Sequence, residues 1–176
     1  MLFGLAFVTA AAASCPQLAG LRSPSVVEHF HTADVVGLWY EQAYIDVAQV
    51  GASCQTLNAT SSDDGTITVD FSVRYGRLPF HLDEIYTPVA TSAVFTKRAG
   101  IPGGKLLRLP TVVVDVTQES LILFSCLAEP LLPTVTELVI ASRTRNVTNA
   151  FVEKQLNLSH ALGVPFAEEK VKRVAC

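Results

Sequence analysis

Apolar and polar residues alternate along most of the chain from Gly37 onward. In the segment 66–75 the apolar side chains fall on one side of an extended chain: Ile67, Val69, Phe71, Val73 and Tyr75. A period of two is typical of a β-strand with one buried face and one solvated face. The turn residues 62–65 connect this strand to the run 53–61, so the two are predicted to form a hairpin.

Further runs of the same kind follow at short intervals, separated by turn-rich segments. They lie at 37–46, 80–89, 92–98, 106–115, 120–127 and 135–143, which brings the prediction to eight strands. Only 149–163 has a helical period, with Asn149 as a cap and with Gly163 and Pro165 at its end. A short run at 171–175 is a candidate ninth strand.

Eight evenly spaced strands and one late helix favour a closed up-and-down barrel. Closure removes the edges of the sheet, and eight strands leave an interior wide enough for one small ligand. A β-sandwich accounts for the alternation equally well on periodicity alone.

The first thirteen residues form an uncharged apolar segment that ends in small side chains. We interpret 1–13 as a secretory signal peptide and 14–176 as a single mature domain. A membrane anchor is the alternative, but the apolar run ends at Cys15-Pro16, short of the ~20 residues that a spanning helix needs. A lipoprotein signal that ends at Cys15 is a second alternative.

The cysteine count and the sequons agree with export from the cell. Four cysteines behind a signal peptide imply two disulfides in one of three pairings: Cys15, Cys54, Cys126 and Cys176. Asn58, Asn146 and Asn157 each begin an N-x-S/T sequon and are predicted glycosylation sites. The net charge is only −3 and the 13 Lys and Arg residues form no stripe, so a nucleic-acid partner is not expected.

Three ordered motifs resemble the lipocalins, especially those similar to apolipoprotein D. The segment 26–41, with Gly37-Leu38-Trp39-Tyr40-Glu41, is similar to the opening signature of that family. The segments 120–126 and 138–143 are similar to its seventh and eighth strands, so the resemblance spans the mature chain. It implies an all-β fold: an eight-stranded antiparallel up-and-down barrel, or calyx, with one C-terminal α-helix packed outside.

The resemblance also assigns structural roles. Trp39 would close one end of the barrel with Arg143 across its ring, and Gly37 would let the N-terminal coil pass closely. The cysteines would pair as Cys15–Cys126 and Cys54–Cys176. An enzyme is not expected, because this pairing leaves no free thiolate and no nucleophile motif is present. No metal site or cofactor is predicted either, since the His29 and His31 pair lacks a third ligand.

What remains is the interior of the barrel as a binding site. The predicted lining consists of Phe71, Val73, Tyr75, Tyr86, Phe95, Leu107, Val113 and Leu123. A filled core is the alternative, because core and cavity wall look alike in a sequence. No charged pair is evident inside.

We therefore expect a secreted, monomeric carrier of one small hydrophobic molecule of the fatty acid, sterol, retinoid or tetrapyrrole class. The rival function is a protein-binding lipocalin, a protease or receptor modulator acting through the open-end loops 46–53, 76–79 and 99–105.

Overall fold

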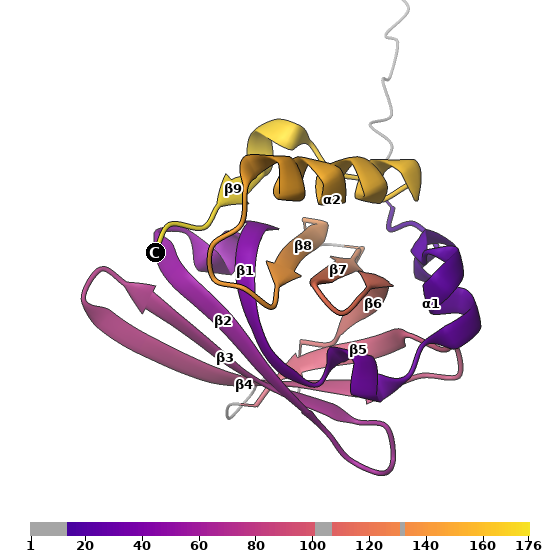
Figure 1. The fold of residues 1–176 in the computed structure, drawn as a ribbon. Helices are drawn as coiled ribbons and strands as arrows, with labels where there is room; N and C mark the ends of the chain where they lie inside the picture. The colour runs from indigo at the N-terminus through magenta and orange to yellow at the C-terminus, as the bar shows by residue number, and fades with distance from the viewer. Residues whose placement is uncertain (1–13, 101–106, 131–132) are drawn as a thin grey trace, which may run out of the picture.

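The computed structural model describes residues 14–100, 107–130 and 133–176, so the predicted signal peptide lies outside the described residues. Eight strands form a closed antiparallel barrel (Figure 1). They are β1 (Gly37–Ile45), β2 (Ala52–Ser61), β3 (Ile67–Tyr75), β4 (Leu78–Pro88), β5 (Val94–Ala99), β6 (Leu109–Val116), β7 (Ser120–Leu127) and β8 (Val135–Ser142). Each strand pairs with the next, and β1 pairs with both β2 and β8. This closure confirms the barrel and excludes the sandwich.

One apolar cluster lies inside the barrel, and it comes mainly from the inward positions of the alternating strands. On β3 the buried members are Ile67, Val69, Phe71 and Val73, the face that the alternation predicts. The cluster also contains Trp39 from β1 and Phe95 from β5. The register therefore follows the hydrophobic pattern, as it must when one face of each strand is buried.

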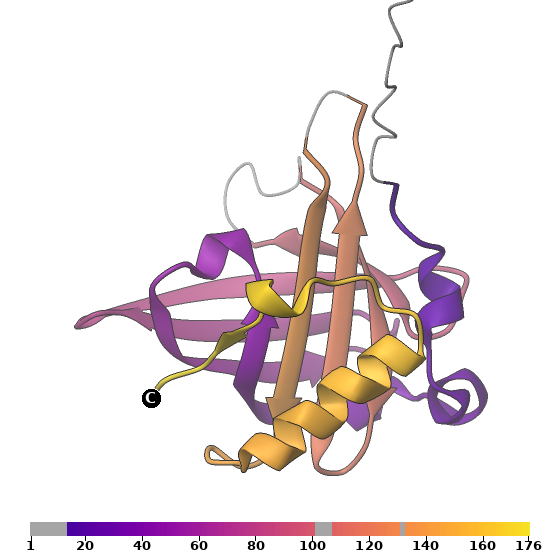
Figure 2. The same ribbon diagram turned by 90° about the horizontal axis from the view of Figure 1, so that it is seen from above.

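A second apolar cluster lies outside the barrel, beneath helix α2 (Asn149–Ala161), which crosses the outer face of the sheet (Figure 2). Val152 and Leu156 of the helix belong to this cluster, together with the outward residues of three strands: Val112, Val114, Ile122, Phe124, Leu138 and Ile140. The strands β6 to β8 are thus buried on both faces, and their sequences are nearly continuous apolar runs. The N-cap of this helix is Thr148 and not the predicted Asn149, which is the first helical residue. The Thr148 hydroxyl accepts a hydrogen bond from the Phe151 amide at 3.2 Å.

The prediction of a single helix was wrong for the N-terminal segment. Helix α1 (Pro24–His29) follows a 3-10 turn, η1 (Leu18–Leu21), and precedes another, η2 (Thr32–Val35). Six residues are too few for a helical period to stand out, but the local signals are present: Ser23 caps the helix and Pro24 occupies its first position. Among the helices of the described residues, none is long and apolar enough to span a bilayer.

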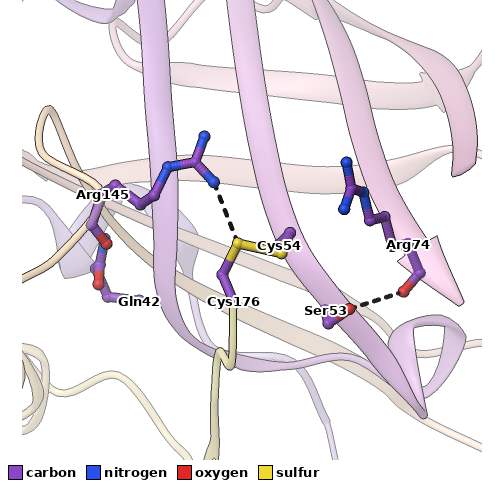
Figure 3. Close-up of a disulfide and its surroundings, with 6 residues drawn as sticks. All are labelled: Gln42, Ser53, Cys54, Arg74, Arg145 and Cys176. Atoms are coloured by element: carbon purple, nitrogen blue, oxygen red, sulfur yellow. Dashed lines mark hydrogen bonds between the residues drawn. A yellow bond between two sulfur atoms is a disulfide. The ribbon is translucent and has the colours of Figure 1, made fainter. Parts of the chain in front are cut away.

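Disulfides join the segment that begins the described residues and the C-terminal segment to the barrel, in the pairing that the family resemblance implies. Cys15 bonds to Cys126 across a Cα–Cα distance of 5.6 Å, and Cys54 bonds to Cys176 across 4.6 Å. The guanidinium of Arg145 donates a hydrogen bond to Cys176 Sγ at 3.1 Å (Figure 3). Just before this bond, β9 (Lys172–Arg173) pairs with β1, so the predicted ninth strand exists but is only two residues long.

Candidate functional site

Trp39 closes one end of the barrel. Its side chain is fully buried, and its indole nitrogen donates a hydrogen bond to the Val35 carbonyl at 2.8 Å. The guanidinium carbon of Arg143 lies 3.4 Å from the centre of the Trp39 ring, a cation–π contact. Arg143 also donates to the Val36 carbonyl at 2.8 Å, so it ties the N-terminal segment across this end.

The close approach of Arg143 to the start of β1 requires a glycine at position 37. Its φ is +100°, a left-handed conformation that favours glycine, and a Cβ at this position would lie 3.0 Å from Arg143 Nη1. Any other residue would strain the backbone and press on the guanidinium. The structure therefore places Gly37, Trp39 and Arg143 together at the closed end.

Directly above Trp39 the interior is apolar and almost filled. About 20 Å³ of free space remains between side chains that include Phe95, Val113 and Leu123. Phe95 contacts Tyr86 and Phe30 edge to face, at centroid distances of 6.3 and 6.2 Å. Such a space holds little more than one water molecule, so this deep part is a packed floor.

The other half of the barrel, toward its open end, contains a larger cavity of about 380 Å³, which we call the upper cavity. Its apolar lining consists mainly of aromatic and leucine side chains: Leu57, Phe71, Tyr75, Phe80, Leu82, Tyr86, Leu107 and Leu109. Leu57 and Tyr86 line both spaces and therefore mark the boundary between the packed floor and the cavity. A volume above ~300 Å³ is in the range of small-molecule sites.

The predicted lining residues divide between the two spaces. Phe71, Tyr75, Tyr86 and Leu107 line the upper cavity, whereas Phe95, Val113 and Leu123 lie around the floor. Val73 is buried in the same apolar cluster but borders neither space. The structure thus brings together seven of the eight residues along the barrel axis, four of them at the cavity itself.

The expectation that no charged pair lies inside was wrong. The ammonium group of Lys97 donates hydrogen bonds to carboxylate oxygens of Glu84, at 3.2 Å, and of Glu137. The three side chains are only 12–16% exposed, and all three line the cavity. The hydroxyl of Tyr86 donates to the other carboxylate oxygen of Glu84 at 2.7 Å. A salt-bridged cluster therefore stands on the cavity wall.

A third carboxyl group, Glu41, faces the cavity with only 2% of its surface exposed. Gln49 donates a hydrogen bond to its Oε1 at 3.4 Å, and Gln55 in turn donates to Gln49 Oε1 at 3.0 Å. The second oxygen, Oε2, is buried and has no hydrogen-bond partner among the described residues. An unpaired buried oxygen of this kind costs free energy that a ligand can recover.

The pKa values of these groups follow from burial and from one another. Burial raises the pKa of the Glu41 carboxyl to about 8, and it also raises the pKa of Glu137 despite the neighbouring Lys97. For Lys97, burial acts to lower the pKa, but the carboxylates of Glu84 and Glu137 outweigh it and hold the pKa well above its usual value. Lys97 is therefore charged, whereas Glu41 holds its proton at neutral pH.

The alternation itself contained the signal for this cluster. Glu84 lies two residues before Tyr86, and Lys97 lies two residues after Phe95, so a period of two places both inside. Glu41 lies two residues after Trp39 in the same way. The predicted lining contains only aliphatic and aromatic residues, so it misses the charged residues on the same faces of the strands.

The mouth of the cavity has an apolar rim. Val47 begins the 3-10 turn η3 (Val47–Gln49), Val50 follows it, and Leu78 begins β4; the three are 72–79% exposed. The hydroxyl of Tyr75 donates to the Ala48 carbonyl at 2.8 Å and joins this turn to β3.

Other predicted sites lie on the surface. Asn58, Asn146 and Asn157 are all exposed, which makes each accessible for glycosylation. Within the described parts of the chain, no three His, Cys, Asp or Glu side chains gather closely enough to hold a metal ion.

No protein-family model matches the chain, and no curated protein matches its sequence. Solved structures are similar in fold. Apocrustacyanin C1 is 13% identical, with a TM-score of 0.66 over 90% of this chain and 83% of that one. Apocrustacyanin C2 is 14% identical, with a TM-score of 0.67 over 90% and 83%. Lobster apocrustacyanin A1 is 14% identical, with a TM-score of 0.66 over 81% and 78%.

At these identities the likeness shows the fold alone, and a particular similarity to apolipoprotein D stays a prediction. The crustacyanins are lipocalins, and this chain shares their architecture of an eight-stranded up-and-down barrel with a C-terminal helix outside.

Proposed function

We propose that the protein is a secreted carrier that reversibly binds one small, largely hydrophobic molecule in the upper cavity. The observation that carries this proposal is the space of about 380 Å³ bordered by Phe71, Tyr75, Phe80 and Leu82. Burial of a guest against such walls contributes about 25 cal/mol per Å² of apolar surface removed from water. The two disulfides support export, because such bonds persist in oxidising compartments.

The geometry favours binding without chemistry. Both disulfides use up the cysteines, so no thiolate faces the cavity. The carboxylates of Glu84 and Glu137 are engaged by Lys97 rather than placed beside a nucleophile. Lipocalin-like neighbours in fold agree with a binding role.

The test is extraction of the protein from its own source, followed by mass spectrometry of what is released, and titration with fluorescent fatty-acid and retinoid probes. We expect a bound molecule or micromolar probe binding. Phe71→Trp, which narrows the cavity, should weaken probe binding, whereas the matched change Phe166→Trp, beside the external helix, should not. Failure to recover any guest, together with no binding of any probe, would refute the carrier function.

A second candidate is a protein-binding module that acts through the open-end loops. The exposed side chains of Val47, Val50 and Leu78 favour it, because apolar residues clustered at a rim are typical of contact surfaces. The cavity volume favours the carrier, since a binding module does not need such a space. Pull-down with Val47→Ser and Leu78→Ser as the negative variants distinguishes the two.

A further inference from the structure

The upper cavity is unevenly charged, and this unevenness restricts what it can bind. Three carboxyl groups (Glu41, Glu84 and Glu137) face one ammonium group, Lys97, in its wall. Asp46 and Arg98 also line the cavity and offset each other in formal charge. Among the described lining residues the cavity thus has an excess of acidic groups.

Lys97 is not available to anchor an anion. Its ammonium group is already bonded to Glu84 and to Glu137, and it lies 6.0 Å from the centre of the Tyr86 ring. A ligand carboxylate at Lys97 would compete with these two carboxylates for the ammonium group and would add a further negative charge beside them, which is unfavourable at a buried position. We therefore expect a fatty acid to bind more weakly than an amine with the same tail.

Glu41, in contrast, has an unfilled bonding site. Its Oε2 is buried, lacks a partner among the described residues, and belongs to a side chain that borders the cavity. The groups around it are Gln49, Asp46, Glu84 and Lys97. A positively charged hydrogen-bond donor can bond to this oxygen, and its charge offsets the excess of acidic groups in the cavity wall.

The polar and apolar residues of the cavity wall lie at different depths. Glu84 lies next to the boundary residue Tyr86, whereas Leu82 and Phe80 continue along β4 toward the mouth. A guest with a charged head near Glu41 and Glu84 would place its apolar part against Phe71, Phe80 and Leu82. The polar groups thus lie inside and the apolar walls lie toward the opening.

Resting on the carrier function, we propose that the preferred guest is an organic cation: a primary amine with an apolar tail, whose ammonium group binds Glu41 and the Glu84–Glu137 pair. An amine donates to Glu41 Oε2 once the carboxyl group has released its proton, and its charge offsets the acidic excess. An alcohol with the same tail can donate to this oxygen but carries no charge, and a carboxylate can do neither.

The test compares three probes that share one alkyl chain, namely decylamine, decan-1-ol and decanoate, by isothermal titration calorimetry with the full mature protein. Decylamine should bind at least about tenfold more tightly than decanol, and decanoate should bind most weakly. Equal binding of the three, or tighter binding of decanoate, would overturn the amine proposal while leaving the carrier function intact. No binding of any of the three would refute both.

Variants locate the head group. Glu41→Gln keeps the shape of the side chain and should reduce decylamine affinity about tenfold, with decanol affinity changed less than about threefold. Glu137→Gln provides a second readout if Glu41→Gln fails to fold, as judged by circular dichroism. The matched control is Glu169→Gln, an exposed carboxylate remote from the cavity lining, which should change neither affinity. If both cavity variants keep the amine preference of the wild type, the proposed head-group site is wrong.

Discussion

Replacing Glu41 by Gln should change how the stability of the protein depends on pH. Burial raises the pKa of this carboxyl from 4.5 to about 8, because desolvation disfavours the charged form. The charges of Glu84 and Asp46 act in the same direction, while the hydrogen bond from Gln49 and the charge of Lys97 oppose it. Unfolding exposes the carboxyl group to water and returns its pKa to the ordinary value.

The direction in which the free energy of unfolding changes with pH follows from proton binding. Between pH 4.5 and about 8 the folded protein holds a proton on Glu41 that the unfolded chain releases, so a rise in pH favours unfolding. The free energy of unfolding therefore decreases through this window and levels off above it. The two pKa values differ by roughly 3.5, and at about 1.4 kcal/mol for each unit of pKa the total loss is about 5 kcal/mol.

The assay is urea unfolding at pH 5 and pH 7.5, followed by the fluorescence of Trp39, the single tryptophan of the chain. Over this interval the stability of Glu41→Gln relative to wild type should rise by about 3 kcal/mol, since the variant has no proton to release. The control Glu169→Gln, at an exposed position, should show a change close to zero. A difference between Glu41→Gln and wild type that stays constant within about 0.5 kcal/mol would refute the reasoning.

Four further predictions follow from the same structure. Trp39→Ala should lower the free energy of unfolding by about 3–5 kcal/mol in urea unfolding followed by circular dichroism, because it empties the closed end; a loss under about 1 kcal/mol would contradict its closing role. Replacing Cys54 and Cys176 together by Ser should cost about 4–5 kcal/mol by the loop-entropy model, and unchanged thermal stability would show that this bond is dispensable. Treatment of the secreted protein with an N-glycosidase should reduce its mass; an unchanged mass would show that the exposed sequons are unused. Binding of decylamine near pH 7 should release protons from Glu41, so the heat should vary with the ionisation enthalpy of the buffer; a buffer-independent heat would place the amine elsewhere.

The barrel was predictable because its signal is local and repeated. The alternation in 66–75 assigns Ile67 and Phe71 to the inside, and β3 buries both. The helix at 149–161 was evident from its apolar stripe and from Gly163 and Pro165 after its end, although its cap is Thr148 and not Asn149. Helix α1 was not, because Pro24–His29 spans fewer than two turns and its stability comes from packing rather than from its own periodicity.

The candidate site was predictable only in part. Four of the predicted lining residues border the cavity, but the sequence does not say that the packed floor around Phe95 ends at Tyr86 and that free space begins there. That boundary depends on how side chains from all the strands fill a common volume. Packing of this kind is a property of the closed barrel and of no single strand.

Within each uninterrupted run of a strand, the sequence by itself determined which residues face inward, because a strand turns alternate side chains to opposite faces. It thereby directed Glu41, Glu84, Lys97 and Glu137 to one interior. It did not reveal the shift in register between Glu41 and Ala43, after which Ala43 packs in the external cluster. Only the tertiary structure decided that Lys97 on β5 reaches both Glu84 on β4 and Glu137 on β8, while Oε2 of Glu41 on β1 is left without a partner among the described residues. Residues 40 positions apart, such as Lys97 and Glu137, meet because closure of the barrel brings their strands around a common axis, and the low polarity of that interior makes their charges matter.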